Sequence, residues 1–319
     1  MKKYTRFIGL LVLFLILYLI DLKKLFINLS GINLSYLFLS IILNIPHLYF
    51  KSLRWNLLLR EQAIFYSKTE SFLIYMSSLY IGFLTPGRLG EFVKVLYLRN
   101  DKKISIGTGF SSVLADRLFD LYLLIILGFI GVWQFNILGQ LSSPFIFLTV
   151  LIILSPLIIL NENLMGKIIG ILFKFAVLKK ISGNIKDNSK AFYNGINQLI
   201  SSKLFFSAIL TCFGYLTFFL QSYLILLSMN ISLSFLTIIL FMSISNLISF
   251  IPISISGLGT RDATLIYLFS TMNLIPEYAV GYSILVFITF FVSGGIMGAI
   301  AWFIKPLSLN EIRKTTKSY

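Results

Sequence analysis

The chain has 319 residues, of which 57% are hydrophobic and only 12% charged, and its formal net charge is +15. Soluble domains carry about twice this charged fraction, so the composition excludes a water-soluble globular protein. Cys212 and His47 are the only residues of their types, which excludes an internal disulfide and argues against a Cys/His metal site; we expect no metal and no cofactor. The lysines and arginines stand mainly in short connections between apolar segments, which indicates membrane topology rather than nucleic-acid binding.

Six apolar segments approach or exceed the roughly 18 residues needed to cross a hydrocarbon core about 30 Å thick. The first is followed by charged residues rather than a small-residue cleavage site, so we interpret it as an uncleaved span. The whole chain, 1–319, is therefore predicted to form one all-α integral membrane domain. The predicted spans are 5–21, 34–50, 110–133, 144–160, 204–227 and 278–304.

Two further apolar stretches are interrupted. The stretch 71–98 is broken at residues 85–91, and the stretch 235–270 is broken at Pro252 and again at residues 256–262. Backbone groups freed by such breaks have to be satisfied inside the protein or in a wet cavity, because lipid offers them no partner. We therefore expect both breaks to lie in the protein interior.

The charges in the connections indicate how the broken stretches run. If both crossed the membrane, the connection 161–203 with its seven lysines would face outside, against the preference of cytoplasmic loops for basic residues. If each stretch instead enters and leaves on one face, both termini and the basic connections 51–68, 94–103 and 161–203 are cytoplasmic. The connections 134–143, 228–234 and 271–277 then lie outside, and they contain no lysine or arginine. The sequence thus predicts a plasma-membrane protein with six crossings and two re-entrant helical hairpins.

Hairpins that enter from opposite faces are typical of an inverted-topology repeat. The sequence contains a faint echo of such a repeat, in which Phe83 and Gly90 of the first break correspond to Phe250 and Gly259 of the second. The alternative is that proline and glycine merely punctuate helices at both places.

Ionisable residues gather at the two breaks and in the span 110–133. Such side chains cost about 3 kcal/mol each at membrane depth, so they are functional candidates by default. Asp116 and Asp120 are four residues apart and share a helix face, whereas Arg117 points elsewhere. We expect the four basic and four acidic residues to be near balance by pairing; the alternative is that they form only structural salt bridges. The eight are Arg88, Glu91, Lys94, Asp116, Arg117, Asp120, Arg261 and Asp262.

The breaks also suggest what the site binds. Helices that restart after Gly90 and Gly259 would direct free backbone N–H groups and positive dipole ends into the protein. Arg88 and Arg261 stand beside these restarts, and a guanidinium can hold phosphate through two hydrogen bonds. The expected ligand is an anionic lipid head group, which the backbone can approach closely at the four glycines of the breaks. These glycines are Gly87, Gly90, Gly257 and Gly259.

Four sequence strings, taken together, resemble a known family. They are LRWNLL at 53–58, TPGRLGE at 85–91, ADRLFD at 115–120 and SGLGTRDA at 256–263. They are similar to, and occur in the same order as, the motifs of the lysylphosphatidylglycerol synthase transmembrane region, also called the flippase-like domain. The resemblance implies movement of aminoacylated or polyprenyl-linked lipids between leaflets. The resemblance places six charged residues on motif positions: Arg88, Glu91, Arg117, Asp120, Arg261 and Asp262. The sequence departs from the family pattern at two positions, because Asp116 stands where glutamate is expected and Ser256 stands where proline is usual.

The resemblance does not imply synthase activity here. Aminoacyl transfer needs a soluble domain, and the longest polar connection, 161–203, is far too short for one. Within it, the alternating apolar and basic residues of 164–174 instead predict an amphipathic helix on anionic lipid; the alternative is a short solvated loop. We therefore predict a protein that is not an enzyme and has no catalytic residue.

Three functions follow from this pattern. The leading prediction is a transporter that carries an anionic phospholipid or polyprenyl-phosphate-linked lipid between leaflets, with Asp116 and Asp120 as counter-charges. An intramembrane enzyme on a lipid phosphate or glycolipid would use Glu91, Asp116 or Asp120 as acid or base. An accessory subunit would present lipid to a partner glycosyltransferase or synthase.

Overall fold

The computed structural model describes residues 15–85, 88–137, 150, 185–201, 203–250 and 257–307, and every regular element in these ranges is a helix. Three described helical segments are long and apolar enough to cross a membrane. They are Leu34–Glu61, Leu204–Ser228 and Pro276–Ile304. The predicted all-helical membrane class is therefore confirmed.

Helix α3 (Leu34–Glu61) begins where the sequence predicts a span, but it continues past the predicted end at residue 50. Asn33 caps its start by accepting a hydrogen bond from the Ser35 N–H at 3.0 Å. The prediction of a connection from residue 51 is wrong, because Lys51 and Arg54 are buried in the helix and paired with carboxylates. Pairing with carboxylates offsets the free-energy cost of removing these two charges from water, so they can lie inside the protein.

Three further predicted spans lie within described helices. Residues 110–133 fall in α6 (Ile106–Gln134), and 204–227 fall in α12 (Leu204–Ser228). Residues 278–304 lie in one continuous rod. This rod consists of α15 (Pro276–Val286), the π-helical turn η3 (Phe287–Val292) and α16 (Ser293–Ile304). The spans predicted at 5–21 and 144–160 lie largely outside the described residues.

Each interrupted stretch forms a longer helix followed by a shorter one. The first consists of α4 (Lys68–Phe83), the 3-10 turn η2 (Leu89–Phe92) and α5 (Val93–Lys102). The second consists of α13 (Phe235–Phe250) and α14 (Thr260–Ser270). At 1.5 Å per residue, α4 and α13 extend about 24 Å, which is less than the roughly 30 Å of a hydrocarbon core.

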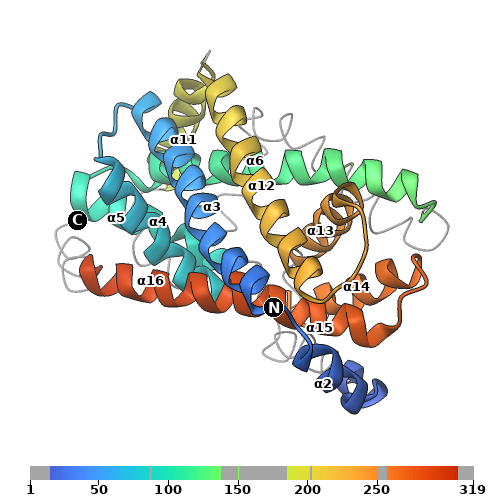
Figure 1. Ribbon diagram of the computed structural model, residues 1–319. Helices are drawn as coiled ribbons and strands as arrows, with labels where there is room; N and C mark the ends of the chain where they lie inside the picture. Colours follow the sequence, from blue (N-terminus) through green and yellow to red (C-terminus); the bar gives the residue numbers. More distant parts are fainter. Residues whose placement is uncertain are drawn as a thin grey trace.

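The helices pack in a pattern that pairs the two halves of the chain. Helices α3 and α12 run beside each other in the middle of the molecule, between α6 and the α15–α16 rod (Figure 1). Helix α4 of the first half packs against α16 of the second, and α13 of the second half packs against α6 of the first. Two short helices complete the described part: α2 (Leu22–Ser30) lies on α15, and α11 (Ile185–Leu199) lies on α6.

Glycines bring both cross-half pairs into close contact. A Cβ at Gly298 of α16 would lie 2.6 Å from the Met76 carbonyl oxygen of α4. A Cβ at Gly131 of α6 would lie 3.1 Å from the Leu240 Cβ of α13. Small residues at helix contacts in membranes allow this approach, which strengthens packing where burial from water gives no driving force.

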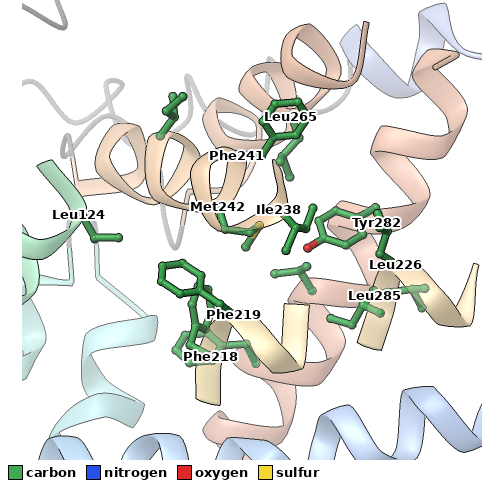
Figure 2. Close-up of a cluster of buried hydrophobic side chains, with 14 of the residues drawn as sticks. Leu124, Phe218, Phe219, Leu226, Ile238, Phe241, Met242, Leu265, Tyr282 and Leu285 are labelled. Atoms are coloured by element: carbon green, nitrogen blue, oxygen red, sulfur yellow. The ribbon is translucent and has the colours of Figure 1, made fainter. Parts of the chain in front are cut away.

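The main apolar core lies among α12, α13, α14 and α15. Phe218 and Phe219 of α12 point toward Met242 of α13, and Tyr282 of α15 closes the cluster (Figure 2). The Tyr282 hydroxyl donates to the Ser222 carbonyl at 3.1 Å, so its buried polar atom is satisfied. This core fixes the second broken stretch against the centre of the molecule.

Helix α11 is the described part of the connection 161–203. Its apolar face, which includes Phe192 and Ile196, is buried against α6. A Cβ at Gly107 of α6 would lie 2.0 Å from the Asn188 carbonyl oxygen, so the two backbones touch. The segment on which the predicted lipid-facing amphipathic helix rests, residues 164–174, lies outside the described residues.

Candidate functional site

An arginine of α3 holds both carboxylates of α6. Because Asp116 and Asp120 are four residues apart, they lie on one face of α6. The Arg54 Nε donates to Asp116 Oδ1 at 2.8 Å, and its Nη1 donates to Asp120 Oδ1 at 2.8 Å and to the Thr211 hydroxyl at 3.0 Å. The three charged side chains are buried, so each depends on the others for its counter-charge.

Two lysines complete this network. The Lys51 Nζ lies 2.8 Å from Asp120 Oδ2, and the Lys94 Nζ lies 3.0 Å from Asp116 Oδ2. The Lys94 ammonium also lies 3.9 Å from the centroid of the Tyr75 ring, which adds a cation–π contact in a desolvated place. Each aspartate is thus bound by Arg54 and by one lysine.

The break after α4 contributes a further ion pair, which Lys94 links to the network through its Nζ, 4.0 Å from Glu91 Oε2. Glu91 of η2 is buried, and its Oε1 lies 2.5 Å from Arg117 Nη2. Arg117 points away from the aspartates beside it in sequence, as its helical position predicts. Its Nη2 also donates to the Arg88 carbonyl at 3.4 Å, so it ties α6 to the broken segment.

Arg88 is the basic side chain of this region without a carboxylate within 4.0 Å in the described part of the chain. Its backbone is left-handed, with φ of 56°, and the turn is held by Thr85, whose carbonyl and hydroxyl accept from the N–H groups of Arg88 and Gly90. Its guanidinium carbon lies 5.1–5.9 Å from four phenylalanine ring centroids. These rings, which we call the phenylalanine cage, are Phe83, Phe250, Phe290 and Phe291.

Arg261 approaches the same cage from the second break. It is 1% exposed, and its guanidinium carbon lies 5.3 Å from the Phe291 centroid. Its Nε donates to the Ser283 hydroxyl at 3.1 Å, and its Nη2 lies 3.4 Å from Asp262 Oδ1. Its Nη1 is buried and has no hydrogen-bond partner among the described residues. The two breaks therefore approach each other at Phe291, and each brings an arginine with donor capacity to spare.

The charges do not balance as the sequence analysis expects. The charged cluster comprises the eight predicted residues together with Lys51 and Arg54, so six basic side chains stand against four acidic ones. The prediction of four against four is wrong because it placed the end of α3 in a connection. A positional signal was available, since Lys51 and Arg54 are three residues apart and share a helix face.

The restarting helices do not present the free N–H groups that the sequence analysis expects. The Gly90 N–H donates to the Thr85 hydroxyl at 2.7 Å, and the Gly259 N–H donates to Asp262 Oδ2 at 2.8 Å. The prediction is therefore wrong for these two N–H groups, because nearby side chains accept their hydrogen bonds.

The described glycines of the breaks are required by the local backbone structure. A Cβ at Gly90 would lie 2.4 Å from the Ile81 carbonyl oxygen, so this glycine lets the break fold back on α4. Gly257 and Gly259 have φ of 77° and 81°, which L side chains rarely adopt. Gly87 lies outside the described residues.

A small cavity of about 10 Å³ lies next to the cage. Its polar lining includes His47, Lys51, Arg88 and Asn246. The His47 Nδ1 lies 2.7 Å from the Gly214 carbonyl, which ties the ring to α12. This volume is about that of one water molecule, so a head group would require the surrounding side chains to move.

Comparison with known proteins places the chain in a family. The model of the lysylphosphatidylglycerol synthase transmembrane region matches residues 6–298. The chain belongs to this family. The four strings that carry the resemblance in the sequence lie within the matched range, and Arg54, Arg88, Asp116 and Arg261 are among their residues.

Curated relatives of this family member include archaeal membrane proteins. The chain is 27% identical over 300 residues to a UPF0104 membrane protein of Methanocaldococcus jannaschii, covering 89% of each chain. A second UPF0104 membrane protein of that organism is 27% identical over 251 residues, which are 75% of this chain and all of the relative. One from Methanothermobacter thermautotrophicus is 23% identical over 260 residues, or 76% and 77% of the two chains. No solved structure matches the chain.

Proposed function

We propose that this protein binds the phosphate of an anionic lipid at Arg88 and moves that lipid between the leaflets of the plasma membrane. One observation carries the proposal: Arg88 has no carboxylate partner among the described residues, whereas the other five basic residues of the charged cluster each have one. A cation held among aromatic rings is costly to leave uncompensated away from water. A bound anion would remove that cost.

The surroundings of Arg88 favour phosphate over a neutral group. The excess of basic side chains in the charged cluster attracts an anion. The Nη1 of Arg261, which has no partner in the described part of the chain, offers a second donor near the same phenylalanine ring. Two guanidinium groups around one phosphate can supply several charge-assisted hydrogen bonds. The aspartates of α6 then act as counter-charges that hold Arg54 and the lysines in place, rather than as ligands.

The proposed topology has six crossings and two re-entrant hairpins, with both termini in the cytoplasm. The short α4 and α13 support it, because each is shorter than the hydrocarbon core is thick and stops at a break. The matched packing of α4 on α16 and of α13 on α6 supports an inverted repeat. In that arrangement Phe83 and Phe250, which end α4 and α13, are equivalent residues on either side of Arg88.

The proposal assigns binding and movement to this chain, and no catalytic step. The family name refers to synthesis of an aminoacylated lipid, so we propose that a separate membrane-bound or soluble synthase or glycosyltransferase makes the lipid that this protein handles. The lipid class that fits Arg88 is an anionic phospholipid or a polyprenyl-phosphate-linked lipid.

The test uses vesicles that contain the purified protein and a phosphatidylglycerol labelled on its head group. Accessibility of the label to a membrane-impermeant quencher reports movement between leaflets, and retention of the lipid on the protein reports binding. Arg88→Gln removes the charge, Arg88→Lys keeps it, and Arg60→Gln makes the same change at an exposed position near the end of α3.

We expect Arg88→Gln to weaken binding and abolish movement, because a charge-assisted hydrogen bond is worth about 1.5–3 kcal/mol, or about tenfold to hundredfold in affinity. Arg88→Lys should retain part of the binding, and Arg60→Gln should match the wild type. Wild-type movement in Arg88→Gln would overturn the proposal.

A further inference from the structure

An apolar groove of about 320 Å³ lies on the outside of the phenylalanine cage. It runs between the end of α4 and the rod formed by α15, η3 and α16. Its wall includes the exposed Leu84, Val292 and Ile296, so the groove opens on the surface that faces lipid. None of the described residues that line it is charged. The lining residues are Tyr80, Phe83, Leu84, Phe287, Phe291, Val292, Gly295, Ile296 and Ala299.

The groove and the arginine site share two walls. Phe83 and Phe291 line the groove, and the same two rings lie 5.6 and 5.1 Å from the Arg88 guanidinium carbon. Only the thickness of these rings separates the apolar groove from the Arg88 guanidinium. A molecule with an anionic group and a hydrocarbon chain could therefore occupy both places at once.

We propose that the groove holds one hydrocarbon chain, acyl or isoprenoid, of the lipid whose phosphate binds Arg88. This inference rests on the proposed function and names the part of the substrate that the groove takes. The apolar lining of the groove matches the hydrocarbon part of such a lipid, and Arg88, behind Phe83 and Phe291, matches its phosphate. In the bilayer a hydrocarbon chain gains little free energy by leaving the neighbouring lipid chains for the groove. The groove therefore sets the position of the lipid more than its affinity.

Gly295 gives a way to fill the groove without disturbing the fold. A Cβ at this position would meet only the Phe83 Cδ2, at the ordinary contact distance of 4.0 Å. Gly295→Leu should therefore extend into the groove and leave helix packing intact. Ile300 of α16 is exposed and outside the groove, so Ile300→Phe is the matched control for added bulk on the same helix.

The experiment uses phosphatidylglycerol with a photoreactive diazirine in one acyl chain, in vesicles of neutral phosphatidylcholine. Cross-linked peptides of the full-length protein are mapped after illumination. We expect adducts on the groove residues Phe287, Val292 and Ile296, lowered about tenfold or more by Gly295→Leu and unchanged by Ile300→Phe. Arg88→Gln should lower the same adducts, because the phosphate anchors the chain there.

Water-soluble dihexanoyl phosphatidylglycerol serves as a separate measure of head-group binding. Groove adducts that survive both Gly295→Leu and Arg88→Gln, or adducts spread evenly over all lipid-facing helices, would overturn the inference. A disulfide between two copies of the protein through a cysteine at position 296, in the Cys212→Ser background, would also overturn it, since a second copy would then occupy the groove. If groove adducts are absent while the short lipid still requires Arg88, the chain-binding inference fails and the proposed function stands. If the short lipid binds equally well to Arg88→Gln, the proposed function itself fails.

Discussion

Replacement of Arg54 and of Arg88 by methionine should affect stability differently, although both arginines belong to the same charged cluster. Arg54 is fully buried and bridges Asp116 and Asp120. In Arg54→Met each aspartate keeps only one lysine, and breaking a buried pair in this way costs about 3–5 kcal/mol. We therefore expect a large loss of stability in this variant.

Arg88 has no described carboxylate that its removal would leave unpaired. Arg88→Met gives up cation–π contacts worth about 0.5–2 kcal/mol. It also removes an unpaired, partly buried charge, whose desolvation costs about several kcal/mol in a dry place and less where solvent reaches it. The two effects oppose each other, so we expect the free energy of unfolding to stay the same or rise.

The measurement is the free energy of unfolding in mixed micelles, followed by tryptophan fluorescence as a denaturing detergent is added. Arg60→Met, at an exposed position, should change it by less than about 0.5 kcal/mol. A loss of 3 kcal/mol or more in Arg88→Met, similar to that in Arg54→Met, would refute the reasoning. It would mean that Arg88 has a structural counter-charge and is not reserved for a ligand.

Two further predictions concern topology and the π-helical turn. With Cys212→Ser as background, a cysteine at position 186 should react with an impermeant thiol reagent only from the cytoplasmic side; labelling only from outside would contradict the proposed topology. Asn44→Leu should lower the free energy of unfolding by about 1–3 kcal/mol, because it removes two hydrogen bonds that the Asn44 side-chain amide donates, to the Phe290 carbonyl of η3 at 3.3 Å and to the Ser293 hydroxyl at 2.8 Å. Stability equal to wild type in mixed micelles would show that this carbonyl does not need the amide.

The parts of the fold that depend on local patterns could be predicted from the sequence. Long apolar runs gave the helices that contain 110–133, 204–227 and 278–304, and proline with glycine marked the ends of α4 and α13. The end of α3 could not be predicted in the same way. A hydropathy pattern treats Lys51 and Arg54 as residues that need water, whereas pairing across helices lets them stay buried.

For the candidate site, the sequence predicted which residues belong to it better than it predicted which of them pair. Charged residues at the breaks were recognisable from their cost in a membrane, and the helical spacing of Asp116 and Asp120 predicted a shared face. Which cation meets which carboxylate depends on how α3, α6 and the first break pack together, and this information is not local. The unpaired state of Arg88 follows from that packing, as does the aromatic cage supplied by both halves of the chain.

Helix α4 of the first half packs on α16 of the second, and α13 of the second half packs on α6 of the first. This arrangement has a consequence for synthesis of the protein. The ion pairs of Arg54 with the α6 aspartates use only residues made in the first part of translation, so these charges can neutralise one another early. Helix α4, in contrast, has to wait for α16 and its Gly298, more than 200 residues later in the chain. At about 5–20 residues per second this delay is roughly 10–40 s. During that interval the face of α4 that will meet α16 has to be covered by lipid or by the insertion machinery, and Arg88 remains outside its cage until the second half of the protein arrives.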